Sequence, residues 1–314
     1  MTAEEAPPPP APRRLLRWIV PALLFVFLAL SATSDLARDV ARGLGQWAAG
    51  VGTLEWRSEA GWVAVPADAG RRRTWEPADA FLTPAWAPAA LGLDVADLSL
   101  RRPPNPLEVT LVLARVDPAR WRFRVWGRPD FSPDSVATLT TEAGLSLALN
   151  ASYFSEDGPL GLVVSDGAVR GRQGVNRAAH FVVPRGGTPA VINRKRAELG
   201  KLDQGFQGFP SIMSGGRTFS YMRYGGRGFD VWTVDRRSAA CSLADGRVLF
   251  LATDTLTNGL SLVELATVLG GLGCVDAMGF DGGSSTGLSL RVGAVARDIA
   301  NLEAVPVIVG VQPR

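Results

Sequence analysis

A short segment near the C-terminal end of the sequence combines a carboxylate, two glycines and three hydroxyl residues. Its members, which follow a mostly apolar run, are Asp281, Gly282, Gly283, Ser284, Ser285 and Thr286. A carboxylate at the end of a buried strand can act as a general acid or base, or can hold a metal ion. The glycines let backbone N–H groups approach a ligand closely. The alternative is a tight Asp-Gly turn, which the same residue types also form.

Two other segments place polar side chains at the ends of apolar strands. Asn150 ends the run 145–150, where its amide could bind a sugar hydroxyl or form a turn. Arg237 precedes the first strand of a predicted hairpin, and its planar guanidinium suits a phosphate, although surface arginines are more often only solvated. Asp254 ends the second strand of that hairpin. Strand ends of this kind present groups to a cleft.

The composition excludes several classes of site. The chain has 314 residues, 46% hydrophobic and 20% charged, which is typical of a packed globule. The net charge is +3, and no Lys/Arg run is interleaved with aromatic residues, so a nucleic-acid partner is not expected. The single histidine, His180, excludes mechanisms that need two imidazoles and is typical of a strand residue. Two cysteines, Cys241 and Cys274, exclude a four-cysteine zinc site; they form either a disulfide or part of an apolar core.

The first 52 residues have the pattern of a tail followed by a membrane segment. Residues 1–14 are proline-rich and predict a disordered cytoplasmic tail. Residues 15–34 predict a transmembrane helix, with a cleaved signal segment as the alternative, because 18–34 carry no charge. Arginines before this segment place the N-terminus inside and the main domain on the extracytoplasmic side of the cytoplasmic membrane. Residues 35–52 predict a short juxtamembrane helix.

The remaining sequence is dominated by short strands that Gly and Pro interrupt. We expect a small strand and loop region at 53–105 and the main domain at 106–314. One long helical pattern spans 261–272, and Asp245-Gly246 predicts a hairpin turn. Because strands and helices do not alternate regularly, the expected fold class is α+β, a strand-rich mixed-sheet domain with few helices.

Taken in order, these segments resemble the phosphodiester glycosidase family over about residues 105–312. The motifs that carry the resemblance are the Asn-ended strand with an aromatic pair and Gly-Pro at 150–161, a Pro-containing segment at 208–215, Arg237-Ser238-Ala239, Glu264-Leu265-Ala266, Asp281-Gly282-Gly283, and Arg297 with Asn301-Leu302. The sequence departs from the family pattern at Gly279, where the family has Asn, and at Ser284, where it has a third glycine.

The resemblance implies a hydrolase that cleaves a sugar C1–O–P linkage in a cell-envelope or exported glycan. It implies Asp281 as acid/base or nucleophile, Asp254 as second carboxylate and Arg237 as phosphate ligand, with Arg297 as a second candidate for the phosphate. The implied substrate-binding residues are Asn150, Tyr153, Phe154, Gly282, Gly283, Ser284, Ser285, Thr286, Arg297 and Asn301.

Two questions stay open at this stage. Scattered Asp and Asn side chains suit a divalent cation such as calcium, but the sequence contains no contiguous calcium loop. The alternative to hydrolysis of the C1–O–P linkage is a protein that acts differently on an envelope polysaccharide, or that binds or assembles one without catalysis. The replacement at Gly279 keeps this alternative open.

Overall fold

The computed structural model describes residues 54–65, 81–103, 105–171, 173–174, 178–193, 198–224 and 230–314. The chain divides into two compact units, Met1–Val51 and Gly52–Arg314, and every described residue belongs to the second. The predicted tail, membrane segment and juxtamembrane helix therefore lie outside the described residues. Within the described ranges, no helix is both long enough and apolar enough to cross a bilayer.

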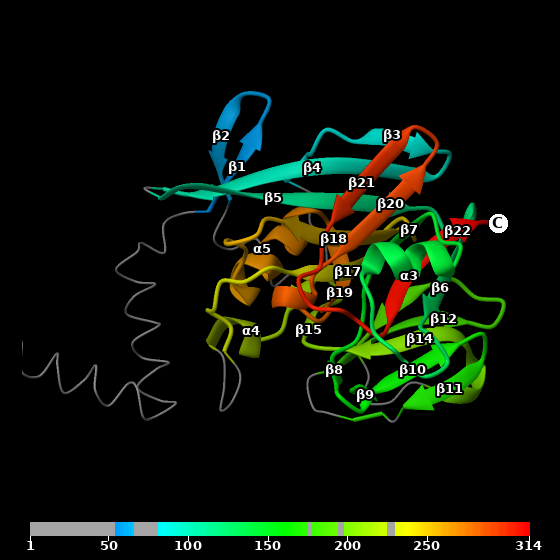
Figure 1. Cartoon of the computed structure of the whole chain (residues 1–314). Coiled ribbons are helices and arrows are strands. Elements are labelled where there is room, and N and C mark those ends of the chain that lie inside the picture. The colour runs from blue at the N-terminus through cyan, green and yellow to red at the C-terminus, as the bar shows by residue number, and fades with distance from the viewer. Residues whose placement is uncertain are drawn as a thin grey trace, which may run out of the picture. The chain divides into compact units, whose positions relative to one another are not determined.

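A ten-stranded sheet forms the centre of the second unit (Figure 1). Its strands are β1 (Glu55–Ser58), β2 (Gly61–Ala64), β3 (Ala87–Ala90), β4 (Leu93–Arg102), β5 (Asn105–Val116), β15 (Ser211–Ser214), β16 (Arg217–Thr218), β17 (Ser238–Leu243), β18 (Val248–Asp254) and β19 (Cys274–Gly279). They are ordered β16-β15-β19-β17-β18-β5-β4-β1-β2, and β3 pairs with β4. Because β4 pairs along the whole of β5, the strands before residue 106 belong to the same sheet as those after it.

Every strand pair in the described part of the chain is antiparallel. The prediction of a strand-rich domain with few helices is confirmed, but the prediction of mixed sheets is wrong for these strands. The helical crossover from β18 to β19 shows the reason. These two strands point the same way, but β17 lies between them and is antiparallel to both.

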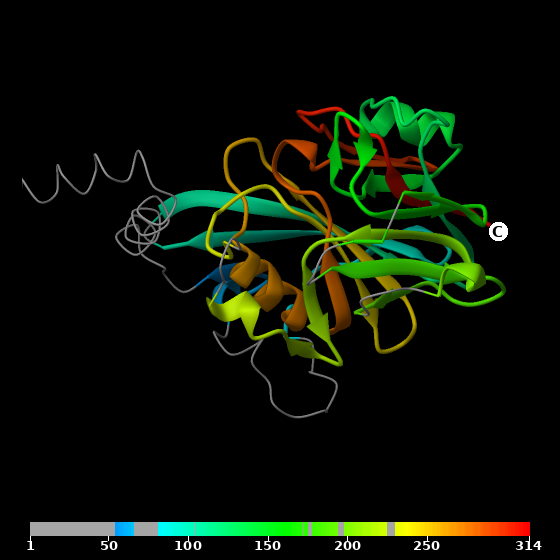
Figure 2. The same cartoon turned by 90° about the horizontal axis from the view of Figure 1, so that it is seen from below.

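Two smaller five-stranded sheets pack against one face of the large sheet, and the helices at residues 221–224 and 262–271 pack against the other (Figures 1 and 2). One sheet contains β10 (Leu162–Ser165), β11 (Ala168–Gly171), β12 (Ala179–Pro184), β13 (Ala190–Ile192) and β14 (Leu202–Gly208). The other contains β6 (Trp121–Trp126), β7 (Leu147–Asn150), β20 (Leu288–Val292), β21 (Val295–Ile299) and β22 (Ile308–Pro313). The remaining elements are the hairpin β8 (Phe154–Ser155) and β9 (Gly158–Pro159), α3 (Val136–Glu142), α4 (Tyr221–Tyr224), α5 (Leu262–Gly271) and the 3-10 turns η1 (Leu199–Lys201) and η2 (Gly283–Ser285).

Successive side chains of the central strands point to opposite faces of the sheet and pack in two different cores. In β18, Leu249 and Leu251 pack in the core beneath α5, whereas Phe250 packs in the core shared with the smaller sheets. The rings of Phe250, Phe123 and Phe181 come from all three sheets, and each pair of ring centroids is 6.0 Å apart. Burial on both faces explains why these strands have almost continuous apolar sequences.

The predicted helix at 261–272 is confirmed as α5. Ser261 caps its N-terminus in a capping box with Glu264, in which each side chain satisfies the other's backbone N–H. The Glu264 carboxylate also accepts a hydrogen bond of 2.8 Å from Arg102 in β4. Gly273, with φ +82°, follows the end of the helix. The predicted hairpin is also confirmed, with β17 and β18 joined across Gly246 at φ +84°.

A disulfide joins Cys241 in β17 to Cys274 in β19, with the two Cα atoms 5.7 Å apart. The sequence left this pairing open against two buried free cysteines. The bond connects the same two strands that lead to Arg237 and Asp281, respectively. It therefore fixes the strand pair on which the candidate site depends.

Replacing both cysteines by alanine is expected to lower the free energy of unfolding by about 2–4 kcal/mol. The closed loop spans a sequence separation of 33 residues, and cross-linking a loop of that length removes entropy mainly from the unfolded chain. Urea unfolding of the oxidised protein and the double variant would measure the difference. Reduction of the wild-type protein should reproduce the loss. Equal midpoints for the oxidised and reduced wild-type protein would contradict the pairing.

Candidate active site

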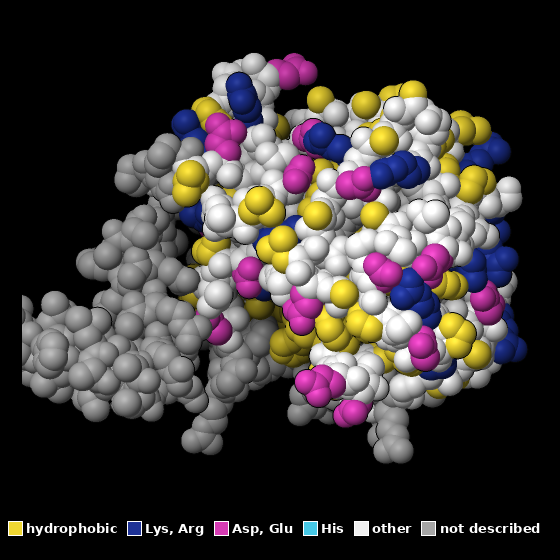
Figure 3. Space-filling view, in the orientation of Figure 1, with side chains coloured by type: hydrophobic (Ala, Val, Ile, Leu, Met, Phe, Trp, Pro, Cys, Tyr) yellow, Lys and Arg dark blue, Asp and Glu magenta, His cyan; other side chains and the backbone are white. Residues whose placement is uncertain are grey.

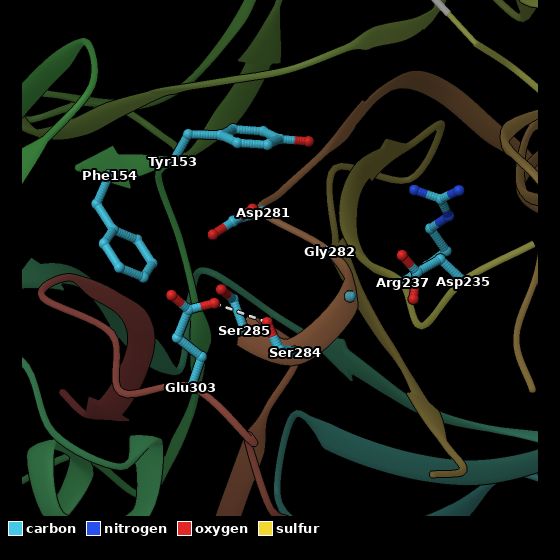
Figure 4. A pocket seen from close by; sticks show the side chains of 10 residues that line it. Tyr153, Phe154, Asp235, Arg237, Asp281, Gly282, Ser284, Ser285 and Glu303 are labelled. Carbon is cyan, nitrogen blue, oxygen red and sulfur yellow. Dashed lines mark hydrogen bonds between the residues drawn. The ribbon is translucent and has the colours of Figure 1, made fainter. Parts of the chain in front are cut away.

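A cavity of about 460 Å³ opens where the ends of β7, β17 and β19 meet. The residues that line it are Tyr153, Phe154, Asp235, Arg237, Asp281, Gly282, Gly283, Ser284, Ser285 and Glu303. They come from four separate stretches of the sequence, and Figure 4 shows Asp281 between the Arg237 side and the Phe154 side. One guanidinium therefore shares the cavity with three carboxylates.

The main chain at Phe280 and Asp281 is hydrogen-bonded to two different sheets. The N–H of Phe280 donates to the carbonyl of Ser238 at 2.9 Å, and the N–H of Asp281 donates to the carbonyl of Ala151 at 3.1 Å. The first bond continues the pairing of β19 with β17, whereas the second reaches the end of β7 in a different sheet. Asp281 therefore lies at the junction of two sheets rather than in a free loop.

Asn150 and Ser238 both donate hydrogen bonds to the backbone carbonyl of Asp281, at 2.6 Å and 3.0 Å. The Oδ1 atom of Asn150 accepts a hydrogen bond from the N–H of Gly287 at 3.2 Å. Asn150 is fully buried and does not line the cavity. The structure therefore places this predicted substrate-binding residue behind the site, where it holds both ends of the segment 281–287.

Glycine is required at both positions after Asp281. A Cβ atom on Gly282 would lie 2.9 Å from the carbonyl oxygen of Arg236. Gly283 has φ +62°, and its Cβ would lie 3.1 Å from Oδ2 of Asp235. The close approach lets the Gly283 N–H donate to the Arg236 carbonyl at 2.9 Å. This bond draws the Asp281 loop against the segment that carries Arg237.

The environment of Asp281 raises the pKa of its carboxyl group to about 6. Burial is the largest cause, and the nearby carboxylates of Glu303 and Asp235 raise the pKa further. A hydrogen bond from Ser285 and another from the Gly282 N–H lower it in part. The group is therefore mostly ionised at pH 7 but close enough to its midpoint to exchange a proton. A pKa near the working pH is typical of a general acid or base.

Hydrogen bonds hold Arg237 rigidly on the side of the cavity that lies away from Phe154 (Figure 4). Its Nε donates to the carbonyl of Leu260 at 2.8 Å, and its Nη2 donates to the carbonyl of Thr233 at 2.7 Å. Burial lowers the pKa of Arg237, and Asp235 is the largest opposing influence. Since an arginine stays protonated even then, it presents a fixed positive charge. It is the only cationic side chain among the described residues that line the cavity.

Tyr153 supplies a neutral donor between these groups. Burial, together with the negative charge of Asp281, raises the pKa of its phenol to about 12, so the hydroxyl keeps its proton at neutral pH. The ring packs edge-on against Phe209, with centroids 6.2 Å apart. Figure 4 shows the hydroxyl directed toward the Arg237 side of the cavity.

Several residues predicted for the site line no part of this cavity. Asp254 is exposed at the end of β18. Arg297 in β21 is paired with Asp97 at 2.5 Å and borders a different cavity. Asn301 accepts a hydrogen bond from the Val136 N–H at 2.9 Å, and so positions the start of α3. Thr286 is fully buried behind the loop. His180, predicted as a strand residue, is buried in β12.

Two carboxylates of the cavity were not predicted from the sequence. Asp235 lies two residues before Arg237, and Glu303 lies two residues after Asn301, so both adjoin motifs that were recognised. Ser284 donates a hydrogen bond of 2.7 Å to Glu303. Among the residues that the structure describes, no group of three or more His, Cys, Asp or Glu side chains is arranged to hold a metal ion.

The sequence of residues 143–312 matches the phosphodiester glycosidase family. The structure resembles the catalytic domain of zebrafish N-acetylglucosamine-1-phosphodiester alpha-N-acetylglucosaminidase, in a form auto-inhibited by its pro-peptide, with TM-score 0.58 and 18% identity over 85% of this chain and 91% of that chain. It also resembles a hypothetical protein from Synechocystis, with TM-score 0.53 and 16% identity. That match covers 74% of this chain, and the chain spans 64% of the length of the Synechocystis protein. No curated protein matches the sequence significantly. At such identities, the structural likenesses show a common fold.

Replacing Asn150 by alanine is expected to lower the free energy of unfolding by about 2–4 kcal/mol, since the buried Gly287 N–H would lose its acceptor. The matched variant Ser238→Ala should cost only about 1 kcal/mol, because Asn150 still donates to the Asp281 carbonyl. Chemical denaturation measures both. If Asn150→Ala lost activity without losing stability, Asn150 would contact substrate directly and the structural role would be refuted.

Asp281→Asn is expected to stabilise the fold above about pH 6. Because the folded pKa is about 6 and the ordinary value is 3.8, the folded state holds the proton more tightly than the unfolded chain does. Ionisation therefore lowers the stability of the wild-type protein as pH rises from 4 to 6, and the full loss persists above pH 6. After allowance for partial exposure, the variant should gain about 1–2 kcal/mol at pH 8 and nothing below pH 4. A constant difference across this range, measured by denaturation, would refute the raised pKa.

Proposed function

The chain belongs to the phosphodiester glycosidase family, and from this premise we propose that its cavity hydrolyses a sugar-1-phosphodiester in a cell-envelope or exported glycan. The observation that carries the proposal is one cavity that holds the poised carboxyl of Asp281 and the fixed guanidinium of Arg237. The reaction needs both charges, because a glycosyl centre becomes positive while a phosphate departs with negative charge.

In this proposal the substrate phosphate binds to Arg237, and its departing oxygen accepts a hydrogen bond from Tyr153. A phosphate is a good leaving group, so hydrogen bonds and charge can replace full proton transfer. The carboxylate of Asp281 faces the anomeric carbon and stabilises its positive charge. The C1–O bond breaks, the phosphate keeps the bonding electrons, and a water oxygen becomes the new substituent on C1.

The water loses one proton in this step. If Asp281 acts as a base, it takes this proton directly. If Asp281 acts as nucleophile, its carboxylate first forms a glycosyl ester with C1; water then attacks C1, the Asp281 carboxylate leaves, and Glu303 takes the proton from that water. The first route inverts and the second retains the anomeric configuration. Glu303 adds negative charge on the sugar side of the same centre, whereas Asp235 lies beside Arg237. These two replace Asp254 as the further carboxylates of the site.

We also propose that the domain acts outside the cytoplasm, anchored by the predicted membrane segment. The Cys241–Cys274 disulfide supports this location, because structural disulfides persist mainly in oxidising compartments. The uncharged segment 18–34 is the candidate anchor.

Gly279 stands where the family has Asn, and this replacement does not remove a side chain from the lining of the cavity. Gly279 lies in β19, and a Cβ atom there would be 3.0 Å from Cδ of Pro210 and 3.2 Å from the carbonyl oxygen of Phe209. The position therefore faces the segment 209–210 and does not line the cavity. The replacement at Gly279 is therefore no argument for a protein that only binds glycan.

Asp281→Asn is expected to lower kcat/KM by about 10²- to 10⁴-fold on a sugar-1-phosphodiester that the wild-type protein cleaves. Mass spectrometry of a panel of hexose and N-acetylhexosamine 1-phosphodiesters should detect free sugar and a phosphomonoester. The wild-type kcat/KM should rise about tenfold per pH unit up to about pH 6 and then level off, because the ionised carboxylate is the active form.

The control is Asp245→Asn, which makes the same change in the exposed β17–β18 turn and should keep full activity. Arg237→Lys keeps the charge but loses the planar fork, and should cost roughly ten- to hundredfold. Release of sugar 1-phosphate in place of free sugar would show that the linkage between the phosphorus and the alcohol is cleaved, and not the C1–O bond. Unchanged turnover in Asp281→Asn would overturn the assignment of this residue.

A further inference from the structure

A second cavity, of about 550 Å³, adjoins the candidate active site. The two cavities share Phe154 and Glu303 as common walls. The further walls used below are Asp130, Phe131, Glu156 and Asp157, which come from the loop before α3 and from the β8–β9 hairpin. The volume is within the range of pockets that bind small ligands.

The order of groups along the first cavity fixes which part of the substrate can reach the second. In Figure 4, Arg237 and Asp235 lie on one side of Asp281, and Phe154 and Glu303 lie on the other. If Arg237 binds the phosphate and Asp281 faces C1, the sugar ring must extend toward Phe154 and Glu303. A substituent on the far side of that ring then enters the second cavity, whereas the leaving alcohol extends beyond Arg237.

The aromatic wall of the second cavity is held in an unusual backbone conformation. Phe131 has φ +58°, a left-handed conformation that is an outlier for a bulky residue. The guanidinium carbon of Arg170 lies 3.7 Å from the centroid of its ring, and Arg170 also donates to the carbonyl of Arg128 at 3.1 Å. A strained aromatic that is clamped at the edge of a cavity is typical of a functional constraint.

The charge of the second cavity is negative. Asp130, Glu156, Asp157 and Glu303 contribute carboxylates, and none of the described residues that line it is Lys, Arg or His. Figure 3 shows acidic side chains at the surface over β8 and β9. Carboxylate oxygens accept hydrogen bonds from sugar hydroxyls, but they repel a uronate or a second phosphate.

We propose that the second cavity binds one further sugar residue without negative charge, attached to the non-reducing side of the sugar whose C1–O–P bond is cleaved. The preferred substrate is then a glycan of at least two residues that carries the phosphodiester at its reducing end. The proposal rests on the proposed function, which supplies the direction of the substrate.

The test compares 1-phosphodiesters with the same leaving alcohol and the same reducing-end sugar. One is a monosaccharide, and the others are disaccharides with a neutral hexose or a glucuronic acid joined through O3, O4 or O6. For at least one linkage, the neutral disaccharide should have a kcat/KM about tenfold or more above that of the monosaccharide. The glucuronic acid analogue of that linkage should lose this advantage.

Two kinds of variant separate the cavity from the rest of the site. Phe131→Ala should lower the ratio of disaccharide to monosaccharide kcat/KM to near one. Because that variant alters a strained loop, the double variant Glu156→Gln/Asp157→Asn provides a second measurement, and it should raise the kcat/KM of the glucuronic acid analogue. The matched control Glu59→Gln/Asp245→Asn removes the same charges from two other exposed turns and should not raise it.

The two proposals fail in different ways. If the monosaccharide is cleaved and no disaccharide is preferred, the second cavity binds no sugar residue and the proposed hydrolysis stands. A preference for the glucuronic acid analogue over the neutral one would also overturn the assignment of a sugar without negative charge. If no substrate of the panel releases free sugar, the proposed function fails, and the sugar subsite fails with it.

Discussion

The backbone carbonyl of Asp281 is the point on which the site depends. It accepts hydrogen bonds from Asn150 in one sheet and from Ser238 in another, while the Asp281 N–H bonds to Ala151. Because both polar groups of this peptide are satisfied by buried partners, the carboxyl group can stay in a desolvated position that raises its pKa. The rest of the fold holds in place the strands whose ends meet at this carbonyl. The large sheet contains β17 and β19, and the smaller sheet that includes β20 and β22 contains β7. The core of three phenylalanine rings holds the sheets together.

Among the described residues that line it, the cavity places its one cation at one side and two of its three carboxylates toward the other. Arg237 is fixed by two carbonyl oxygens, so its guanidinium does not have to be ordered when a ligand binds. Asp235 lies beside it, Asp281 follows, and Glu303 lies on the far side, where it also lines the second cavity. A substrate with a phosphate at one end and a ring that becomes positive at the other matches this arrangement. Preorganised charges of this kind stabilise a transition state because they need no rearrangement during the reaction.

Local sequence patterns predicted the elements that local interactions determine. The helix at 261–272 follows from its apolar spacing and its Ser261–Glu264 capping box, and the β17–β18 hairpin follows from its Asp-Gly turn. The pairing of distant strands has no such local signal. Asp254 and Arg237 both lie at strand ends, but only Arg237 lines the cavity. Arg237 lies opposite Thr253 on the paired strand, and Asp254, the next residue after Thr253, points to the other side. The role of Asn150 depends on a partner 131 residues away, which no local pattern shows.

The disulfide and the Asp281 carbonyl lie at opposite ends of the β17–β19 pair. Cys241 and Cys274 close one end, while Ser238 and the Gly283 N–H bond to Arg236 close the other. The two strands are therefore fixed to each other at both ends, by a covalent bond at one and by hydrogen bonds at the other. A thermal fluctuation that changed the separation between Arg237 and Asp281 would have to bend both strands together against the sheet. The spacing of the two charges is therefore a property of the scaffold, and the loops around the cavities are free to differ without changing it.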